Sequence, residues 1–194
     1  MITHFTKSLI SWLIQHDAIT EHDRELYEYA VYSILLTISP IFFSIVVGYL
    51  LGLLKESIIM VLPFTIIRKF SGGYHAGNIK YCLAGSCCIL AFCIKMTTIA
   101  KCGLGLSIIT LCAIISLCIN SPIEHENHTL NINEKQAYAK ITRYITFSFE
   151  IIRVALCKLQ RNEYAICISI GLILTAALQI PCLLQKKYAK KKPL

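Results

Sequence analysis

The chain has 194 residues, of which 56% are hydrophobic and only 15% charged, and this balance excludes an ordinary soluble domain of that length. Lys and Arg number 19 against 11 Asp and Glu, and a net charge of +8 can indicate a nucleic-acid partner. The charges lie between long apolar runs and in a C-terminal tail, however, as membrane topology requires. We therefore expect an integral membrane protein in a lipid bilayer and no nucleic-acid partner.

The first 54 residues divide into an amphipathic part and a long apolar run. Residues 1–28 mix apolar and charged side chains, which favours a helix or helix pair on the membrane surface with Trp12 at the interface. The apolar patch at 9–14 is too short for a signal peptide, so we expect an uncleaved N-terminus. Run 29–54 carries no charge and exceeds the roughly 20 residues that cross a bilayer.

Five further apolar runs follow. Run 57–67 contains Pro63, which we expect to kink or break it, leaving either a short tilted span or a re-entrant segment. After the polar, glycine-rich segment 68–81 come runs 82–100 and 102–121, joined by a tight turn at 101–103. Segment 122–143 is expected to be a polar loop. Run 144–157 is marginal because it contains Glu150 and Arg153, which are spaced to pair on a helix. Run 164–185 is uncharged and precedes five lysines.

These runs predict a single all-α, polytopic membrane domain over residues 1–194 with about six transmembrane helices. It comprises the amphipathic region 1–28, a membrane bundle 29–185 and a basic cytoplasmic tail 186–194. Six crossings put both termini and the segments 68–81 and 122–143 in the cytoplasm of a multi-pass protein of the cell membrane. Four crossings, without 57–67 and 144–157, are the alternative, and they move both segments outside.

The segment 68–82 holds the best candidate for chemistry. Its His75 and Cys82 lie at a membrane boundary with Arg68 and Lys80 nearby, and positive charge or a histidine base favours the reactive thiolate. On an uninterrupted helix the two residues would stand about 10 Å apart along the axis, too far for a hydrogen bond. The alternative is a plain connector in which Cys82, one of ten cysteines, only packs as a small hydrophobe.

Glycines make such a continuous helix unfavourable. Gly72, Gly73 and Gly77 interrupt it, and Asn78 is a suitable N-cap for a helix beginning near Ile79. The histidine can then fold back towards the cysteine, which would lie near the helix N-terminus, where the macrodipole stabilises a negative sulfur.

Two competing motifs are weaker. The histidines of the stretch 125–128 have one residue too few between them for a zinc-binding HExxH helix, so we expect no metal and no cofactor. A Gly-Leu-Ser triplet at 105–107 suggests an intramembrane serine nucleophile, but no histidine occurs in a later run, and helix packing by small residues is the preferred interpretation.

The arginine at 68, the Gly-Gly-Tyr-His-Ala stretch 72–76 and the cysteine seven residues after the histidine resemble the accessory gene regulator protein B (AgrB) family. The resemblance implies a membrane cysteine endopeptidase that processes a peptide pheromone precursor for quorum sensing in a Gram-positive bacterium. It implies His75 as base and Cys82 as nucleophile, with Arg68, Gly72 and Gly73 in support.

The resemblance also implies partners and a product. The substrate would be a small AgrD-like propeptide, closed after cleavage into a lactone-type ring, and the enzyme would be a possible homodimer. Loop 122–143 departs from the family in having fewer lysines than expected, so no substrate contact is assigned there.

Two alternative functions remain for this chain. It could be a transporter or exporter subunit, or it could be a non-catalytic partner of a sensor kinase. A short neighbouring reading frame for an amphipathic peptide with an internal Cys or Ser and an acidic tail would favour the peptidase.

Overall fold

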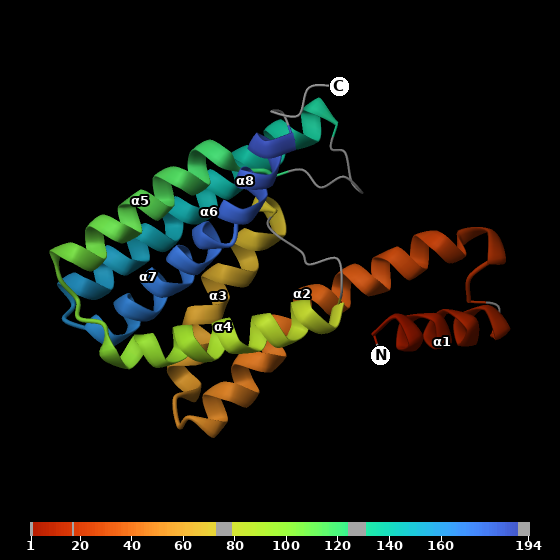
Figure 1. Cartoon of the computed structure of the whole chain (residues 1–194), viewed down its shortest axis with the longest axis horizontal. Helices are drawn as coiled ribbons and strands as arrows, with labels where there is room; N and C mark the ends of the chain where they lie inside the picture. Colours follow the sequence, from red (N-terminus) through yellow and green to blue (C-terminus); the bar gives the residue numbers. More distant parts are fainter. Residues whose placement is uncertain (1, 17, 73–78, 124–130, 190–194) are drawn as a thin grey trace.

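The computed structural model describes residues 2–16, 18–72, 79–123 and 131–189, and over these ranges the chain is helical with no strand. The all-α prediction is confirmed. The elements are α1 Ile2–Gln15, a 3-10 turn η1 Glu21–Asp23, α2 Arg24–Leu50, α3 Leu54–Ser71, α4 Ile79–Ile99, α5 Leu104–Asn120, α6 Ile132–Lys158, α7 Asn162–Ala177 and α8 Ile180–Ala189 (Figure 1).

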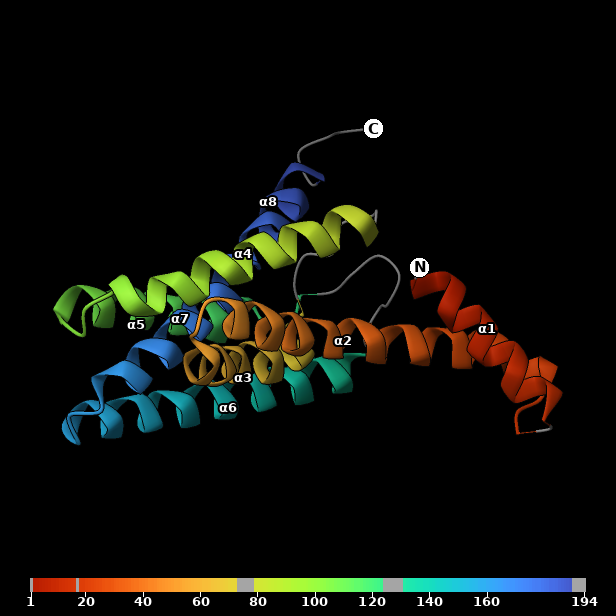
Figure 2. The same cartoon turned by 90° about the horizontal axis from the view of Figure 1, so that it is seen from below.

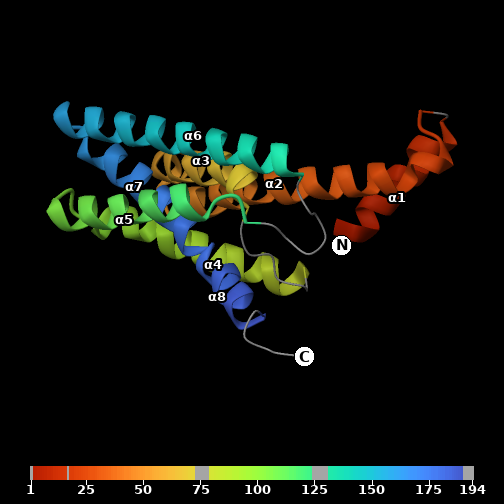
Figure 3. The same cartoon turned by 90° about the horizontal axis from the view of Figure 1, so that it is seen from above.

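Helix α7 forms the centre of the bundle, in contact with α3, α4, α5 and α6. Figures 2 and 3 show α4 and α8 on one side of the bundle and α6 on the other. Most of α7 is buried, and two apolar clusters fill the space around it. One contains Met60 of α3 and Ile94 of α4, and the other contains Ile114 and Leu117 of α5. Van der Waals contact among these close-packed side chains holds the bundle together.

Two glycines allow neighbouring helices to approach closely. A Cβ added to Gly171 of α7 would collide with the carbonyl oxygen of Met60 and lie 2.7 Å from Cγ of Pro63, both in α3. A Cβ added to Gly48 of α2 would collide with the hydroxyl of Ser57 in α3. In lipid the hydrophobic effect does not drive helices together, and small residues at helix crossings allow the close van der Waals packing that does.

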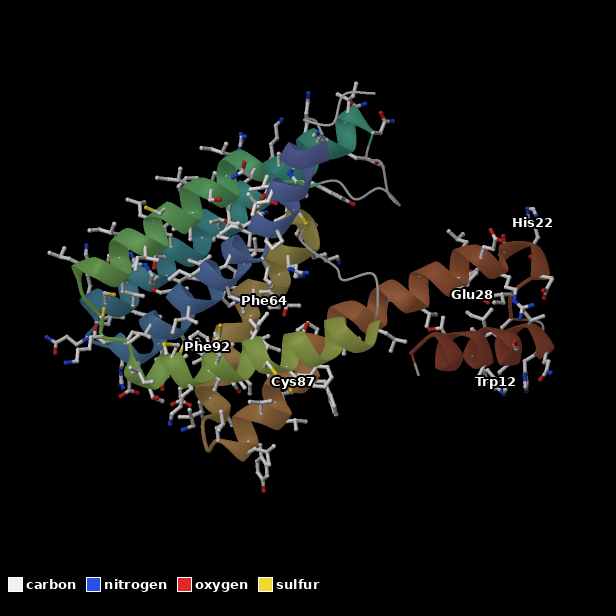
Figure 4. The ribbon with its side chains drawn as sticks, in the orientation of Figure 1. Trp12, His22, Glu28, Phe64, Cys87 and Phe92 are labelled. Atoms are coloured by element: carbon white, nitrogen blue, oxygen red, sulfur yellow. The ribbon has the colours of Figure 1, made fainter. Side chains whose placement is uncertain are left out.

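The N-terminal region is a helical hairpin that projects from the bundle (Figures 1 and 2). Helix α1 packs on the start of α2, and Arg24 joins them by donating hydrogen bonds to Ser11 (3.1 Å) and Glu28 (3.3 Å) and pairing with Glu21. The bond to Glu21 is the main reason that the pKa of Arg24 is raised. Trp12 is 53% exposed on the side of α1 away from α2 (Figure 4), so the region is helical as expected, and its place on the membrane surface stays a prediction.

The outward faces of the bundle are apolar. Helix α5 alone exposes six large aliphatic side chains: Leu104, Ile108, Ile109, Leu111, Ile115 and Ile119. Among the described residues one helical stretch, Asn162–Leu184, is long and apolar enough to cross a membrane, and Ile38–Leu50, Gly85–Ile99 and Leu104–Asn120 are shorter apolar helices. The sixth apolar run therefore qualifies as a span by length, and the count of six stays a prediction.

Three expectations need correction. Pro63 does not break its run, because α3 continues from Leu54 to Ser71 and the proline ring is buried beside Gly171 of α7, while the expected kink stays a prediction. The expected loop 122–143 is partly helical, because Asn131 caps Ile132 (2.8 Å) and Glu134 caps Asn131 in return (3.0 Å), which starts α6 well before run 144–157.

The sixth run contains two helices, since α7 ends at Ala177 and α8 begins at Ile180. The expected packing role of the triplet 105–107 is wrong for its glycine, because nothing lies within 4 Å of a Cβ built on Gly105.

Candidate functional site

The structure describes helix α4 from Ile79 to Ile99, and Cys82 lies in the first turn of this described part, while the start near Ile79 and the cap at Asn78 stay predictions. The unpaired backbone N–H groups and the macrodipole of that turn favour negative charge, which suits a thiolate nucleophile. His75, Gly73 and Asn78 lie outside the described residues. The roles of His75 and Cys82 thus stay predictions, while the end of α3 at Ser71 and the conformation of Gly72 are described.

The segment starts at Gly72, which ends α3 in a conformation that favours glycine, with φ of 71°. A Cβ here would stand 2.5 Å from the carbonyl oxygen of Ile123, which follows the end of α5. Gly72 therefore has a structural role in this close approach of two chain segments, and its support of catalysis stays a prediction.

A buried amide fastens these segments to the α7–α8 link. Gln179 is fully buried, and its Nε2 donates to the hydroxyl of Ser121 (2.9 Å) and the carbonyl oxygen of Ser71 (3.3 Å). The same carbonyl accepts from the backbone N–H of Ile123 (2.9 Å). We call Ser71, Gly72, Ser121, Ile123 and Gln179 the Gln179 junction. It fixes the exits of α3 and α5, from which segments 73–78 and 124–130 continue.

Sequence reasoning missed this junction. The available signal was Gln179 itself, a large polar side chain inside the apolar run 164–185. A polar group in an apolar span is costly unless it is hydrogen-bonded, so it marks either a structural contact or a functional site.

Basic and aromatic side chains surround the same end of the bundle. Arg68, in the last turn of α3, has its guanidinium 5.6 Å from the ring centre of Phe64 (Figure 4). Phe70 meets Tyr138 of α6 edge to face at 5.8 Å. Arg143 of α6 donates to the carbonyl oxygen of Cys118 in α5 (3.3 Å). The first half of α6, which was expected to be a loop, therefore packs against α3 and α5 at this end of the bundle.

The predicted pairing of Glu150 with Arg153 is confirmed at the opposite end. Arg153 is buried, and its Nε donates to Glu150 over 2.7 Å, while its Nη1 lies 3.5 Å from the hydroxyl of Ser107. Ser107 therefore contacts a guanidinium. The described part of the chain holds no group of three or more His, Cys, Asp or Glu that could bind a metal, and the histidines 125 and 128 lie outside it.

Comparison with known proteins agrees with the motif. The chain matches the family described as "Accessory gene regulator B" over residues 6–181. It is 28% identical over 120 residues to "Putative AgrB-like protein 1" of Clostridium perfringens (strain 13 / Type A), covering 61% of this chain and 64% of that relative. It is 26% identical over 152 residues to "Putative AgrB-like protein" of Clostridium perfringens (strain SM101 / Type A), covering 72% and 69%. No solved structure matches.

These matches define an accessory component of quorum sensing in a membrane-associated class of proteins. The chain belongs to the AgrB family, since the match covers most of its length. The alignment with the first relative spans just under two thirds of that protein, and the word "putative" stands in both relatives' names.

Proposed function

We propose that this chain is a membrane cysteine endopeptidase that cleaves a small AgrD-like propeptide and supports its closure into a lactone-type autoinducing ring. The observation that carries the proposal is the position of Cys82 in the first turn of α4, directly after a short segment that contains His75 and starts at the fixed Gly72. The AgrB membership supports it, because that family is associated with propeptide processing.

The proposed reaction runs through a thioester. His75 takes the thiol proton, the Cys82 sulfur bonds to the peptide carbonyl carbon, and the C–N bond breaks as His75 protonates the leaving amine. A thiol or hydroxyl inside the propeptide then attacks the thioester and releases Cys82. Because one acyl bond replaces another, the bond energy that hydrolysis would lose is kept in the ring. The site must therefore exclude water, which suits a membrane boundary.

The Gln179 junction would support this chemistry by fixing the start of the segment that carries His75. Catalysis requires a base and a nucleophile to be held in productive geometry, and a misplacement of about 1 Å can lower the rate about 100-fold. Arg68 and exposed Lys69 leave positive charge at the same end, and this charge is complementary to an acidic propeptide tail.

We propose a multi-pass protein with six crossings and both termini in the cytoplasm, and the burial pattern supports more than one crossing. The best span candidate includes α7, which is enclosed by α3, α4, α5 and α6. A central helix can cross the bilayer only if its neighbours occupy the same layer. Those neighbours expose large aliphatic side chains outward, whereas a soluble bundle would place polar residues there. The six-span arrangement puts the Gln179 junction on the cytoplasmic side, where a propeptide is made.

Co-expression with the propeptide tests the assignment. Cys82→Ala and His75→Ala should each abolish cleavage, which is measured by mass spectrometry of the peptide products. The amount of membrane-inserted protein should be the same as for the wild type. Cys87→Ala is the matched control, because Cys87 lies in the same helix beyond its first turn (Figure 4) and should be dispensable. Cleavage by Cys82→Ala at the wild-type rate would refute the nucleophile.

A further inference from the structure

Two half-buried cysteines meet at the end of the bundle opposite the Gln179 junction. Cys102 lies in the turn between α4 and α5, and Cys157 is in the last turn of α6. Their Sγ atoms are 3.4 Å apart although 55 residues separate them in the sequence. Figures 1 and 3 show the α4–α5 and α6–α7 turns at the same end of the bundle. The fold, rather than local sequence, creates this contact.

We propose that Cys102 and Cys157 form a disulfide on the outer face of the membrane. A disulfide bond is about 2.0 Å long, so the sulfurs must approach by about 1.4 Å from their present separation. Cys102 lies outside any helix, and Cys157 precedes the final residue of α6. Both cysteines therefore lie in a turn or at a helix end, where the chain adjusts more easily than in a helix interior.

The surroundings hold both partners in place. Arg153 stands one helical turn before Cys157, and it contacts Glu150 in its own helix and Ser107 near the start of α5. These polar contacts already join α6 to α5 beside the sulfur pair. A disulfide here would join α6 covalently to the α4–α5 turn. It would add no constraint at the opposite end of the bundle, where the Gln179 junction lies.

The six-span topology of the proposed function places this end outside the cell, and the disulfide rests on that topology but not on peptidase chemistry. Disulfides persist in oxidising compartments. The oxidant would be an extracellular disulfide, either small or on a protein. One cysteine thiolate attacks it and forms a mixed disulfide, and the second cysteine then displaces the remaining thiol. The protein loses two electrons and two protons, and the oxidant leaves as two thiols.

Differential alkylation of the full chain in cells tests the proposal. Free thiols are blocked with one maleimide under denaturing conditions, and the protein is reduced and treated with an isotopically distinct maleimide before peptide mass spectrometry. Cys102 and Cys157 should carry the second label, and without reduction their joined peptides should weigh two hydrogens less than the sum. Cys102→Ser should give Cys157 the first label, whereas Cys112→Ser, the matched control in α5, should change neither.

Predominance of the first label on both residues of the wild-type protein would overturn the disulfide. A membrane-impermeant maleimide applied to intact cells then identifies the cause. Labelling of Cys102 and Cys157 from outside would show that the topology is right and the disulfide is wrong. Labelling only after permeabilisation would show that this end faces the cytoplasm, and the topology of the proposed function would fail too. Cleavage of the propeptide is measured separately.

Discussion

Replacing Gly171 by alanine tests the close crossing of α3 and α7. The added Cβ would collide with the carbonyl oxygen of Met60 and crowd the ring of Pro63, and neither group can rotate away. Overpacking costs about 1–3 kcal/mol. The helix preference of alanine over glycine, about 0.5–1 kcal/mol, offsets part of this. A net loss of roughly 1–2 kcal/mol lowers the midpoint of thermal unfolding by about 2–8 °C for a chain of this size.

The unfolding assay uses the thiol of Cys167, which is fully buried one turn before Gly171. The other nine cysteines are replaced first, because Cys88 and Cys112 among them are exposed and would react in the folded protein. Reaction with a fluorogenic maleimide is then followed while the purified protein is heated in detergent. Gly105→Ala is the matched control, because nothing lies within 4 Å of a Cβ at that helical position, and its midpoint should equal or exceed that of the wild type. Unchanged midpoints in Gly171→Ala, or an equal loss in Gly105→Ala, would refute the packing argument.

Three further predictions address the polar contacts and the topology. Gln179→Leu removes the two hydrogen bonds of its amide, and we expect about 1–3 kcal/mol lower stability in the same assay and at least a tenfold loss of propeptide cleavage. Glu150→Ala leaves the buried Arg153 uncompensated and should destabilise by about 3–5 kcal/mol, while adding Arg153→Met should restore most of the loss, as measured by thermal unfolding. In a protein without its native cysteines, a membrane-impermeant maleimide should label Lys55→Cys in intact cells, and it should label Lys69→Cys only after permeabilisation. In a four-span protein both positions would lie outside the cell, and both would be labelled in intact cells.

Expectations that rested on local signals agree with the structure. Glycines and a candidate cap predicted a helix over the residues that follow Asn78, and the structure describes α4 from Ile79 onward. A Lys-Cys-Gly turn separated two apolar runs, and α4 and α5 meet at that turn. The spacing of Glu150 and Arg153 predicted their ion pair. In each case the residues that decide the geometry are within a few positions of one another.

Two features that the sequence did not predict depend on distant partners. Pro63 was expected to kink or break its run, and the helix does not break there because the proline packs against Gly171 of α7, more than 100 residues away. The role of Gln179 depends on the exits of two other helices, which no periodicity in its own run indicates. The early start of α6 had a readable local signal in Asn131 and Glu134, but the charged residues that follow favoured a loop.

Capture of the covalent intermediate tests the central claim most directly. Membranes containing the wild-type protein are mixed with the propeptide, quenched in acid and digested for mass spectrometry. The peptide that contains Cys82 should gain the mass of the acyl fragment, and hydroxylamine should remove it because thioesters are labile to that nucleophile. His75→Ala should lower the yield, and Cys82→Ala should give none. An acyl fragment on another residue, or cleavage without any adduct on Cys82 at early times, would contradict the proposed chemistry.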